Sequence, residues 1–403
     1  MIYFDYSATT PLEKKVLEAM LPYFYDKFAN PASIHTPGQV ALKAVEDARY
    51  KIAELIGSKG SEIIFTSGAT EANNLALRGI LEALVLKNDK RKHIISTVIE
   101  HSSILEPLND LKKQGYKIEL LPVDKNGLVS ASVLTKAITE DTVLVSIGYV
   151  NSEVGSIEPI DRLGRLIKKI NAHRYNAWLK LSTRKRGDKP QPIYFHTDAT
   201  QAFNVTTCNI NKLHVDLMSL SGHKVYGPKG IGLLFVRRGT PLKPQLFGGH
   251  QERNLRSGTL NVPGIIGLAK ALDMAQKNRL AFNNKVGKLR NDFIKKLLKL
   301  VPSLIITVDQ SLVSAMHANI IFPKVSGDAL LSALDEKGIA VSTGSACASG
   351  DLEASHVLKA LGYKADLAQS ALRFTFGRLT TNQEIDKAVK LIATTYKTCL
   401  SRG

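Results

Sequence analysis

The sequence contains few cysteines and no long apolar run. Only Cys208, Cys347 and Cys399 occur among its 403 residues, and so small and odd a number does not build a disulfide framework. No apolar stretch approaches the roughly 18 residues that span a bilayer. The segment Met1–Tyr6 lacks the basic flank and apolar core of a signal peptide. These absences predict reduced thiols, no membrane partner and a cytoplasmic location.

The sequence also lacks internal repeats, low-complexity tracts and any spacing typical of metal ligands, so no metal site is predicted. Its composition, 44% hydrophobic and 22% charged, is that of an ordinary globular protein, which excludes a disordered chain. A chain of this length is long enough for two domains and a large core.

Basic residues exceed acidic ones by a wide margin, and the formal net charge is +18. Such an excess favours an acidic partner, whether nucleic acid, an acidic protein or an anionic cofactor, and identifies none of them. Part of the charge lies in the run Arg174–Pro190, between a predicted helix and a predicted strand. A solvated surface loop is the more common origin of such a run, and no nucleic-acid-binding motif accompanies it.

Short apolar runs alternate with amphipathic helical segments over the first 236 residues. This alternation predicts an α/β fold in which a mostly parallel seven-stranded sheet is covered by helices on both faces. In such sheets ligands bind beyond the carboxyl ends of the strands. The predicted strands are Ile63–Phe65, His93–Val98, Tyr116–Leu121, Val143–Ile147, Ile193–Phe195, Val215–Leu220 and Ile231–Val236.

The pattern changes after Gly258–Pro263, which we interpret as a domain boundary. A long helical stretch follows over Gly264–Leu300, and we expect it to be broken. Short strands near residues 319–322, 340–342 and 372–374 then alternate with helices, which predicts a smaller α+β domain.

Two chemically suggestive residues follow consecutive predicted strands. Lys224 lies in a loop rich in glycine, proline and serine, and Asp198 ends the preceding strand. A pyridoxal phosphate (PLP) enzyme needs a lysine amine to bind the cofactor aldehyde and an acid to keep the pyridine nitrogen protonated. Taken alone, the lysine could also belong to a phosphate-binding loop, and most lysines in loops are simply solvated.

Other strand ends carry further candidates. Thr66–Asn73 passes from a strand through small residues into a helix, where unpaired amides could bind a phosphate, although an ordinary capping turn looks similar. His101 follows another strand and could equally be a buried structural histidine. Cys347 lies among small residues, whereas a structural cysteine normally has bulky apolar neighbours. We therefore expect a mobile, exposed cysteine loop at about residues 342–352.

Eight short motifs occur in an order that resembles the cysteine desulfurases of the IscS/NifS type, within the class V aminotransferases. They are Ser7–Pro11, Asn30–Ser33, Thr66–Glu71, Glu100-His101, Asp198–Gln201, Ser221–Lys224, Arg256–Thr259 and Gly344–Cys347. The resemblance covers the chain from about Phe4 to the last helix. It implies a PLP-dependent transferase of fold-type I and a homodimer. The large domain would span residues 15–262, and residues 1–14 and 263–403 would form the small domain.

The resemblance also implies roles for individual residues. Lys224 would bind the cofactor aldehyde and act as base, Asp198 would pair with the pyridine nitrogen, and Cys347 would be the nucleophile that receives sulfur. Ser152 stands where the family commonly has a second asparagine that contacts the cofactor. The other implied cofactor ligands are Ala69, Thr70, His101, Asn151, Gln201, Ser221, His223 and, from the second subunit, Thr259. Asn30 and Arg373 would bind the substrate carboxylate.

The implied reaction converts L-cysteine to L-alanine and leaves a persulfide on Cys347. The sulfur would pass to an acceptor protein, such as an IscU-type scaffold, for iron-sulfur cluster assembly or for thiolation of tRNA or another target. A selenocysteine lyase or an aminotransferase would share Lys224 and Asp198 without needing Cys347. A basic module that binds nucleic acid or protein is the alternative of another class.

Overall fold

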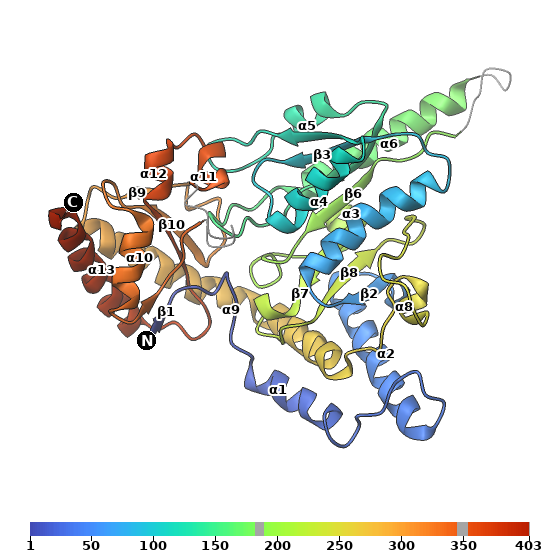
Figure 1. Cartoon of the computed structure of the whole chain (residues 1–403), viewed down its shortest axis with the longest axis horizontal. Helices are drawn as coiled ribbons and strands as arrows, with labels where there is room; N and C mark the ends of the chain where they lie inside the picture. Colours follow the sequence, from blue (N-terminus) through green and yellow to red (C-terminus); the bar gives the residue numbers. More distant parts are fainter. Residues whose placement is uncertain (182–188, 345–353, 403) are drawn as a thin grey trace.

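The computed structural model describes residues 1–181, 189–344 and 354–402. Two parts lie side by side in Figure 1, and the long helix α9 (Val262–Leu300) extends from one part to the other. Within the described ranges, no helix is both long and apolar enough to cross a membrane.

The larger part is built around a seven-stranded sheet in the order β2-β8-β7-β6-β5-β3-β4. Neighbouring strands from β7 to β4 are parallel, and only β8 runs antiparallel, between β2 and β7. This confirms the predicted mostly parallel sheet, and each predicted run overlaps one strand. The bounds are β2 (Ile63–Thr66), β3 (His93–Thr97), β4 (Lys117–Leu121), β5 (Thr142–Ser146), β6 (Tyr194–Asp198), β7 (Leu217–Ser221) and β8 (Gly232–Val236).

Helices cover both faces of this sheet, so alternate side chains of one strand enter different cores. Phe65 belongs to the main core, whereas its neighbour Ile64 packs with α3 and α4 on the other face. This arrangement explains why the strands read as continuous apolar runs rather than as alternating ones. The helices are α1 (Lys14–Met20), α2 (Thr36–Ile56), α3 (Ala69–Val85), α4 (Ser102–Lys113), α5 (Ala131–Ala137), α6 (Ile160–Lys180), α7 (Ile210–Leu213) and α8 (Gln251–Asn254).

The smaller part combines an antiparallel sheet, β12-β10-β9, with four helices and the start of the chain. Residues Ile2 and Tyr3 form β1, which pairs in parallel with β11, and Asp5 forms a bridge to Thr375. The N-terminal segment therefore belongs to this part by backbone pairing. The remaining bounds are β9 (Ile305–Ile306), β10 (His317–Ile321), β11 (Ile339–Ala340), β12 (Ala371–Thr375), α10 (Gly327–Asp335), α11 (His356–Ala360), α12 (Ala365–Gln369) and α13 (Asn382–Arg402).

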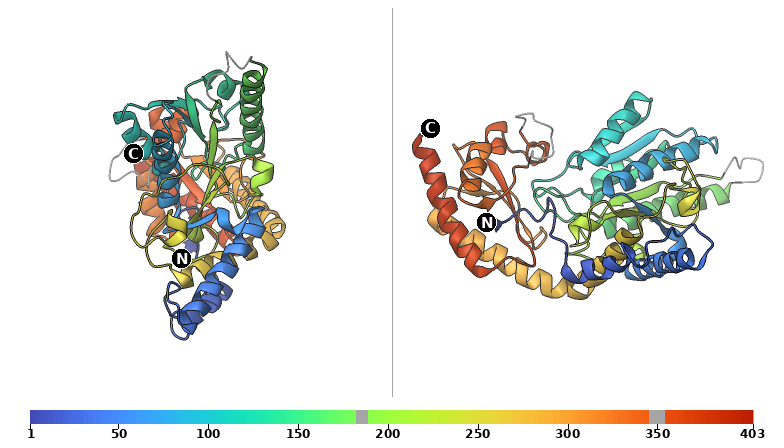
Figure 2. Two further views of the ribbon diagram at one scale, coloured as in Figure 1. Left: turned by 90° about the vertical axis from the view of Figure 1, so that its right-hand side faces the viewer. Right: turned by 60° about the horizontal axis from the view of Figure 1, so that its bottom comes forward.

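The expectation of a broken helix after residue 263 is wrong, because α9 is one continuous helix of 39 residues. Its only proline, Pro263, lies in the first turn, where proline is tolerated. Gly267 lies where an added Cβ would come within 2.6 Å of the sulfur of Met20, so this glycine permits close helix packing. Helices α1, α2 and α13 all pack against α9, and Figure 2 shows it curving beneath both parts. Tertiary contacts therefore stabilise it along its length.

Candidate active site

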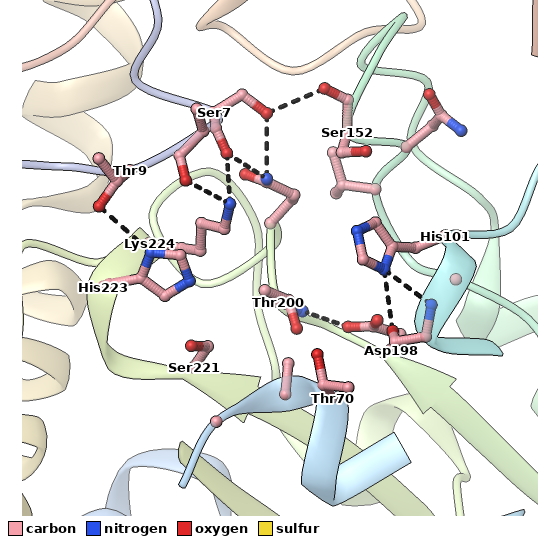
Figure 3. A pocket seen from close by; sticks show the side chains of 18 of the residues that line it. Ser7, Thr9, Thr70, His101, Ser152, Asp198, Thr200, Ser221, His223 and Lys224 are labelled. Carbon is pink, nitrogen blue, oxygen red and sulfur yellow. Dashed lines mark hydrogen bonds between the residues drawn. The ribbon is translucent and has the colours of Figure 1, made fainter. Parts of the chain in front are cut away.

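A cavity of about 860 Å³ opens at the carboxyl ends of the parallel strands, where the fold predicts a ligand site. Its walls come from both parts of the molecule. Strand-end residues such as Asp198 and Ser221 line one side, and Asp5, Ser342 and Arg373 line the other. Figure 3 shows the polar side chains that converge on it.

Lys224 reaches this cavity from a short 3₁₀ turn, Gly222–Lys224, that directly follows β7. The turn is tight, since a Cβ added at Gly222 would lie 2.7 Å from the carbonyl oxygen of Pro228. The Lys224 amine donates hydrogen bonds to the carbonyl oxygens of Ser7 at 2.6 Å and Ala8 at 2.7 Å (Figure 3). The N-terminal segment therefore holds the amine at the cavity wall.

Asp198 ends β6, next to β7 in the sheet, so the structure brings it into the same cavity as Lys224. Its Oδ1 accepts from the Thr200 amide at 2.9 Å, and its Oδ2 accepts from the Asn73 side chain at 2.8 Å. Each oxygen accepts one of these bonds and keeps a further lone pair, so the carboxylate retains capacity to accept a charge-assisted hydrogen bond. Asn73 is completely buried in α3 and also donates to Ser103 Oγ.

Sequence reasoning missed Asn73, although a signal was present. The residue follows Ala69 and Thr70 by about one helical turn, so it projects from the same helix start as these predicted phosphate ligands. It fixes the orientation of the Asp198 carboxylate.

Several donors converge at the other end of the cavity. Helix α3 begins at Ala69 without a side-chain cap, which leaves its first backbone amides available. Thr70, Ser221 and His223 line the cavity (Figure 3). Lys229 also lines it and adds a positive charge. This donor set suits a phosphate group.

His223 is neutral at pH 7. Burial, followed by the positive charges of Lys224 and Lys229, lowers the pKa of its imidazole to about 4. Its Nδ1 lies 3.2 Å from Thr9 Oγ1, which fixes the ring against the N-terminal segment. A neutral imidazole can still donate one hydrogen bond to an anion.

The described residues fit PLP as a group with a phosphate at one end and a ring nitrogen at the other. Helix α3 and its hydroxyl neighbours suit the phosphate, and Asp198 suits the nitrogen. The Oγ1 atom of Thr200 is buried beside Asp198 and has no hydrogen-bond partner among the described residues. An unpaired buried hydroxyl at a cavity wall is typical of a site that a ligand completes.

His101 and Gln201 are the predicted neighbours of the cofactor ring, and both line the cavity. His101 precedes α4, and its Nδ1 accepts from the Ser103 amide at 3.1 Å and lies 2.9 Å from Ser103 Oγ. Nδ1 is therefore the acceptor, which fixes the orientation of the ring. The Gln201 side chain donates to Ser7 O at 2.9 Å and lies 3.0 Å from Ser7 Oγ.

Asn151 and Ser152 lie in the turn after β5, at the cavity wall. Asn151 stabilises this turn, because its side chain donates to Ile99 O and accepts from the amides of Glu153 and Val154. Ser152 contributes its carbonyl oxygen, which accepts from Ser7 Oγ at 2.9 Å and from Arg373 at 3.1 Å.

Arg373 enters the cavity from β12, in the smaller part. It is 7% exposed, and its guanidinium forms an ion pair with Asp5 at 2.7 Å. The Nε atom is buried and has no hydrogen-bond partner among the described residues. Sequence reasoning identified Arg373 but missed its partner Asp5, because their pairing depends on the bridge between the N-terminal segment and β12.

Two other predicted residues do not line this cavity. Asn30 is exposed, and its Oδ1 accepts from the Ala32 amide. Thr259 is also exposed and absent from the cavity wall, and its predicted role is in a second subunit. Cys347 lies outside the described residues. The roles of these three residues stay predictions.

Buried glutamates adjoin the site and were not predicted. Glu100 and Glu158 both line the cavity. Burial is the main cause that raises the pKa of the Glu100 carboxyl to about 7, although Gly148 and Thr97 donate hydrogen bonds to it. Burial likewise raises the pKa of Glu158 well above its usual value. Among the described residues, no group of three or more histidines, cysteines or acids could hold a metal ion.

Comparison with known proteins gives concordant matches over the length of the chain. The family model Aminotransferase class-V matches residues 2–175 and 185–388. A relative named cysteine desulfurase IscS, from Dictyoglomus turgidum, is 42% identical over 97% of this chain and 93% of its own length. A relative with the same name from Methanosarcina thermophila is also 42% identical, over 97% of this chain and 91% of its own length.

A solved structure described as a NifS-like protein superposes with a TM-score of 0.88 at 35% identity, covering 98% of this chain and 99% of that one. This likeness extends the sequence match to the three-dimensional arrangement of both parts.

Proposed function

The chain belongs to the class V aminotransferase family and is a cysteine desulfurase of the IscS/NifS type, and we propose that its catalytic residues are Lys224, His101 and Cys347. One observation carries this assignment of the site. The Lys224 amine, the Asp198 carboxylate and the Arg373 guanidinium line a single cavity, although they come from both parts of the molecule.

PLP is the proposed cofactor, and when bound it supplies an electron sink that stabilises negative charge at the α-carbon of an amino acid. Asp198 keeps the ring nitrogen protonated, since its carboxylate is fixed by Asn73 and Thr200. Thr70, Ser221, His223 and the amide of Ala69 hold the phosphate. His101 would stack on the ring, Gln201 would hydrogen-bond its phenolic oxygen, and Asn151 and Ser152 would be further cofactor contacts.

L-Cysteine is the proposed substrate, and a solved structure described as SspA in complex with cysteine is 33% identical to this chain, with a TM-score of 0.76, covering 94% of this chain and 100% of that one. Arg373 binds the substrate carboxylate, aided by Asn30. Lys224 removes the α-proton, a task for which its position beside the cavity suits a general base. Hydrogen bonds to the carbonyl oxygens of Ser7 and Ala8 fix the position of this amine.

Cys347 then receives the sulfur. Its thiolate attacks the substrate sulfur, a sulfur-sulfur bond forms, and the carbon-sulfur bond breaks with its electron pair passing to Cβ, which takes a proton. The products are L-alanine and a persulfide on Cys347. We propose a cytoplasmic homodimer in which Thr259 of each subunit completes the phosphate site of the other. An IscU-type scaffold protein is the proposed sulfur acceptor, for iron-sulfur cluster assembly or thiolation.

The first test measures alanine and sulfide formed from L-cysteine and a thiol reductant by the wild type and by Cys347→Ala. We expect turnover by the wild type and none by the variant, with the visible absorption of the bound cofactor unchanged. Alanine production without dependence on Cys347 would instead indicate a lyase. A protein that binds no PLP would contradict the assignment of the cavity.

A further inference from the structure

Glu153 is a buried acid in the turn after β5, and no step of the proposed reaction uses it. Its residue is 4% exposed. The turn that carries it is fixed by the Asn151 side chain, which accepts from the backbone amides of Glu153 at 2.9 Å and Val154 at 3.0 Å. The Glu153 carboxyl is therefore presented by a rigid segment of the larger part.

One oxygen of this carboxyl contacts Ser355, the N-cap residue of α11. Ser355 Oγ lies 2.9 Å from Glu153 Oε2 and donates to it. The same hydroxyl caps α11, since it accepts from the Leu358 amide at 3.2 Å. Glu153 consequently fixes the start of α11, just after residues 345–353.

The other oxygen faces Gly344, just before residues 345–353. A Cβ added at Gly344 would collide with Glu153 Oε1, so a larger residue here would force the Glu153 carboxyl to shift. Two residues earlier, Ser342 exchanges backbone hydrogen bonds with Arg373 at 2.7 and 3.3 Å. The chain before residue 345 is therefore held between β12 and the Glu153 carboxyl.

Burial of the Glu153 carboxyl carries a desolvation penalty that its hydrogen bonds do not fully offset. Its Oε1 atom has no hydrogen-bond partner among the described residues. Burial raises the pKa of this carboxyl to about 7, against the opposing effects of Ser355 and of the Arg373 charge. An apolar residue would fill the space without an unpaired polar atom, so stability alone does not account for a glutamate here.

We propose that Glu153 is a positioning residue that fixes both ends of the segment carrying Cys347, through Gly344 on one side and Ser355 on the other. The inference rests on the proposed function, because it concerns the cysteine that receives the sulfur. Placement of a nucleophile is sensitive to displacements of about 1 Å, which can change a rate by roughly 100-fold.

Two substitutions of Glu153 distinguish a positioning role from a general effect on protein stability. In the full-length PLP-loaded protein, Glu153→Ala should lower kcat for alanine formation by about 10- to 100-fold, with KM and the visible absorption of the cofactor largely unchanged. Glu153→Gln keeps the volume and can still accept from Ser355, so it should restore most of kcat. Equal rates for wild type and Glu153→Ala would overturn the proposal, as would a loss in Glu153→Gln as large as that in Glu153→Ala.

A double variant tests the contact with Gly344 directly. Gly344→Ala should lower kcat strongly in the wild type, because its methyl group meets the Glu153 carboxyl. In a Glu153→Ala background the same change should cost much less, since the obstructing oxygen is gone. Losses that simply multiply would show that Gly344 and Glu153 act independently and would overturn the proposal.

Matched controls exclude a general effect of changing buried acids or glycines. Asp216→Asn alters a partly buried acid at the opposite end of β7, where its carboxyl accepts from the Phe195 amide, and should leave kcat unchanged. Gly287→Ala adds a methyl group that comes only within 3.6 Å of Ala315.

Cys347→Ala distinguishes failure of the proposed function from failure of the positioning role. If it keeps full alanine production, the proposed function fails, whereas if it is inactive and Glu153→Ala is normal, only the positioning role fails.

Discussion

The two walls of the active-site cavity are built in different ways. On the cofactor side, Asp198 is the last residue of β6, and Lys224 follows the end of β7 by three positions. On the substrate side, Arg373 pairs with Asp5, 368 positions away in the sequence. Each residue of the first wall is placed by the strand that precedes it, whereas the second wall exists only after distant segments have paired.

The walls also differ electrostatically. The cofactor side combines the Asp198 carboxylate and the amines of Lys224 and Lys229 with a neutral donor, His223, whose pKa is lowered to about 4 by burial and by these two lysines. The substrate side holds a buried ion pair, and removal of one partner from such a pair leaves an uncompensated charge. We therefore expect substitutions on the cofactor side to affect chemistry and those on the substrate side to affect binding.

The largest effect should come from Lys224→Ala, which removes both the cofactor link and the base. Alanine formation should fall by at least about 100- to 10,000-fold, since this is the usual contribution of a general base. The visible absorption of bound PLP should change as well, which a spectrum of the purified protein would reveal. If both the spectrum and the activity are retained, Lys224 is neither the cofactor link nor the base.

Glu100→Gln should alter how stability depends on pH. Because the pKa of Glu100 is raised from 4.5 to about 7, mainly by burial, the folded state keeps a proton that the unfolded state has lost within this window. This component of stability therefore decreases as pH rises, by roughly 3 kcal/mol across the window. Glu100→Gln should lack this pH-dependent component of stability. Denaturant unfolding at about pH 5 and about pH 8 would test this, and equal changes in both proteins would contradict the assignment to Glu100.

Arg373→Lys should separate binding from cofactor chemistry. Lysine keeps the charge but loses the planar pair of donors, so KM for L-cysteine should rise by about 10- to 100-fold, equivalent to 1.5–3 kcal/mol. Steady-state kinetics would measure the change, with the cofactor spectrum as an internal control. A decrease in kcat at constant KM would place Arg373 with the chemical step instead.

The smallest effect should come from Ser152→Ala. The hydrogen bonds from Ser7 and Arg373 are accepted by the Ser152 backbone carbonyl, which this change preserves. Activity should therefore stay within about twofold of the wild type, as for a change of at most 0.5 kcal/mol. A much larger loss of activity would assign the Ser152 hydroxyl a direct contact with cofactor or substrate.

Much of the fold could be predicted because its signals are local. The apolar runs located all seven strands of the main sheet, and Gly57, at φ 74°, ends α2 as expected of a C-terminal cap. The prediction of a broken helix was wrong, because contacts with α1, α2 and α13 stabilise α9 as one continuous helix. The division into residues 15–262 and the remainder stays a prediction.

The candidate site divides in the same way. Lys224, Asp198 and Thr70 were identified from strand ends and short motifs, and the structure brings them to one cavity. Asn73, Asp5 and Ser7 were not, because each acts through a partner on a distant segment. The role of Thr259 depends on a second subunit, Cys347 lies outside the described residues, and Asn30 does not line the cavity, so these three roles stay predictions.

The sequence by itself determined the α/β class, the order of the strands along the chain and the residues that end them. Hydrophobic periodicity and turn chemistry act over a few residues, so short stretches of sequence determine these features. Only the tertiary structure decided that Ser7 and Ala8 hold the Lys224 amine, that Asp5 pairs with Arg373 and that Glu153 lies between Gly344 and Ser355. Such contacts join segments that are far apart in the chain, and they form because the packing of both parts buries these polar groups together.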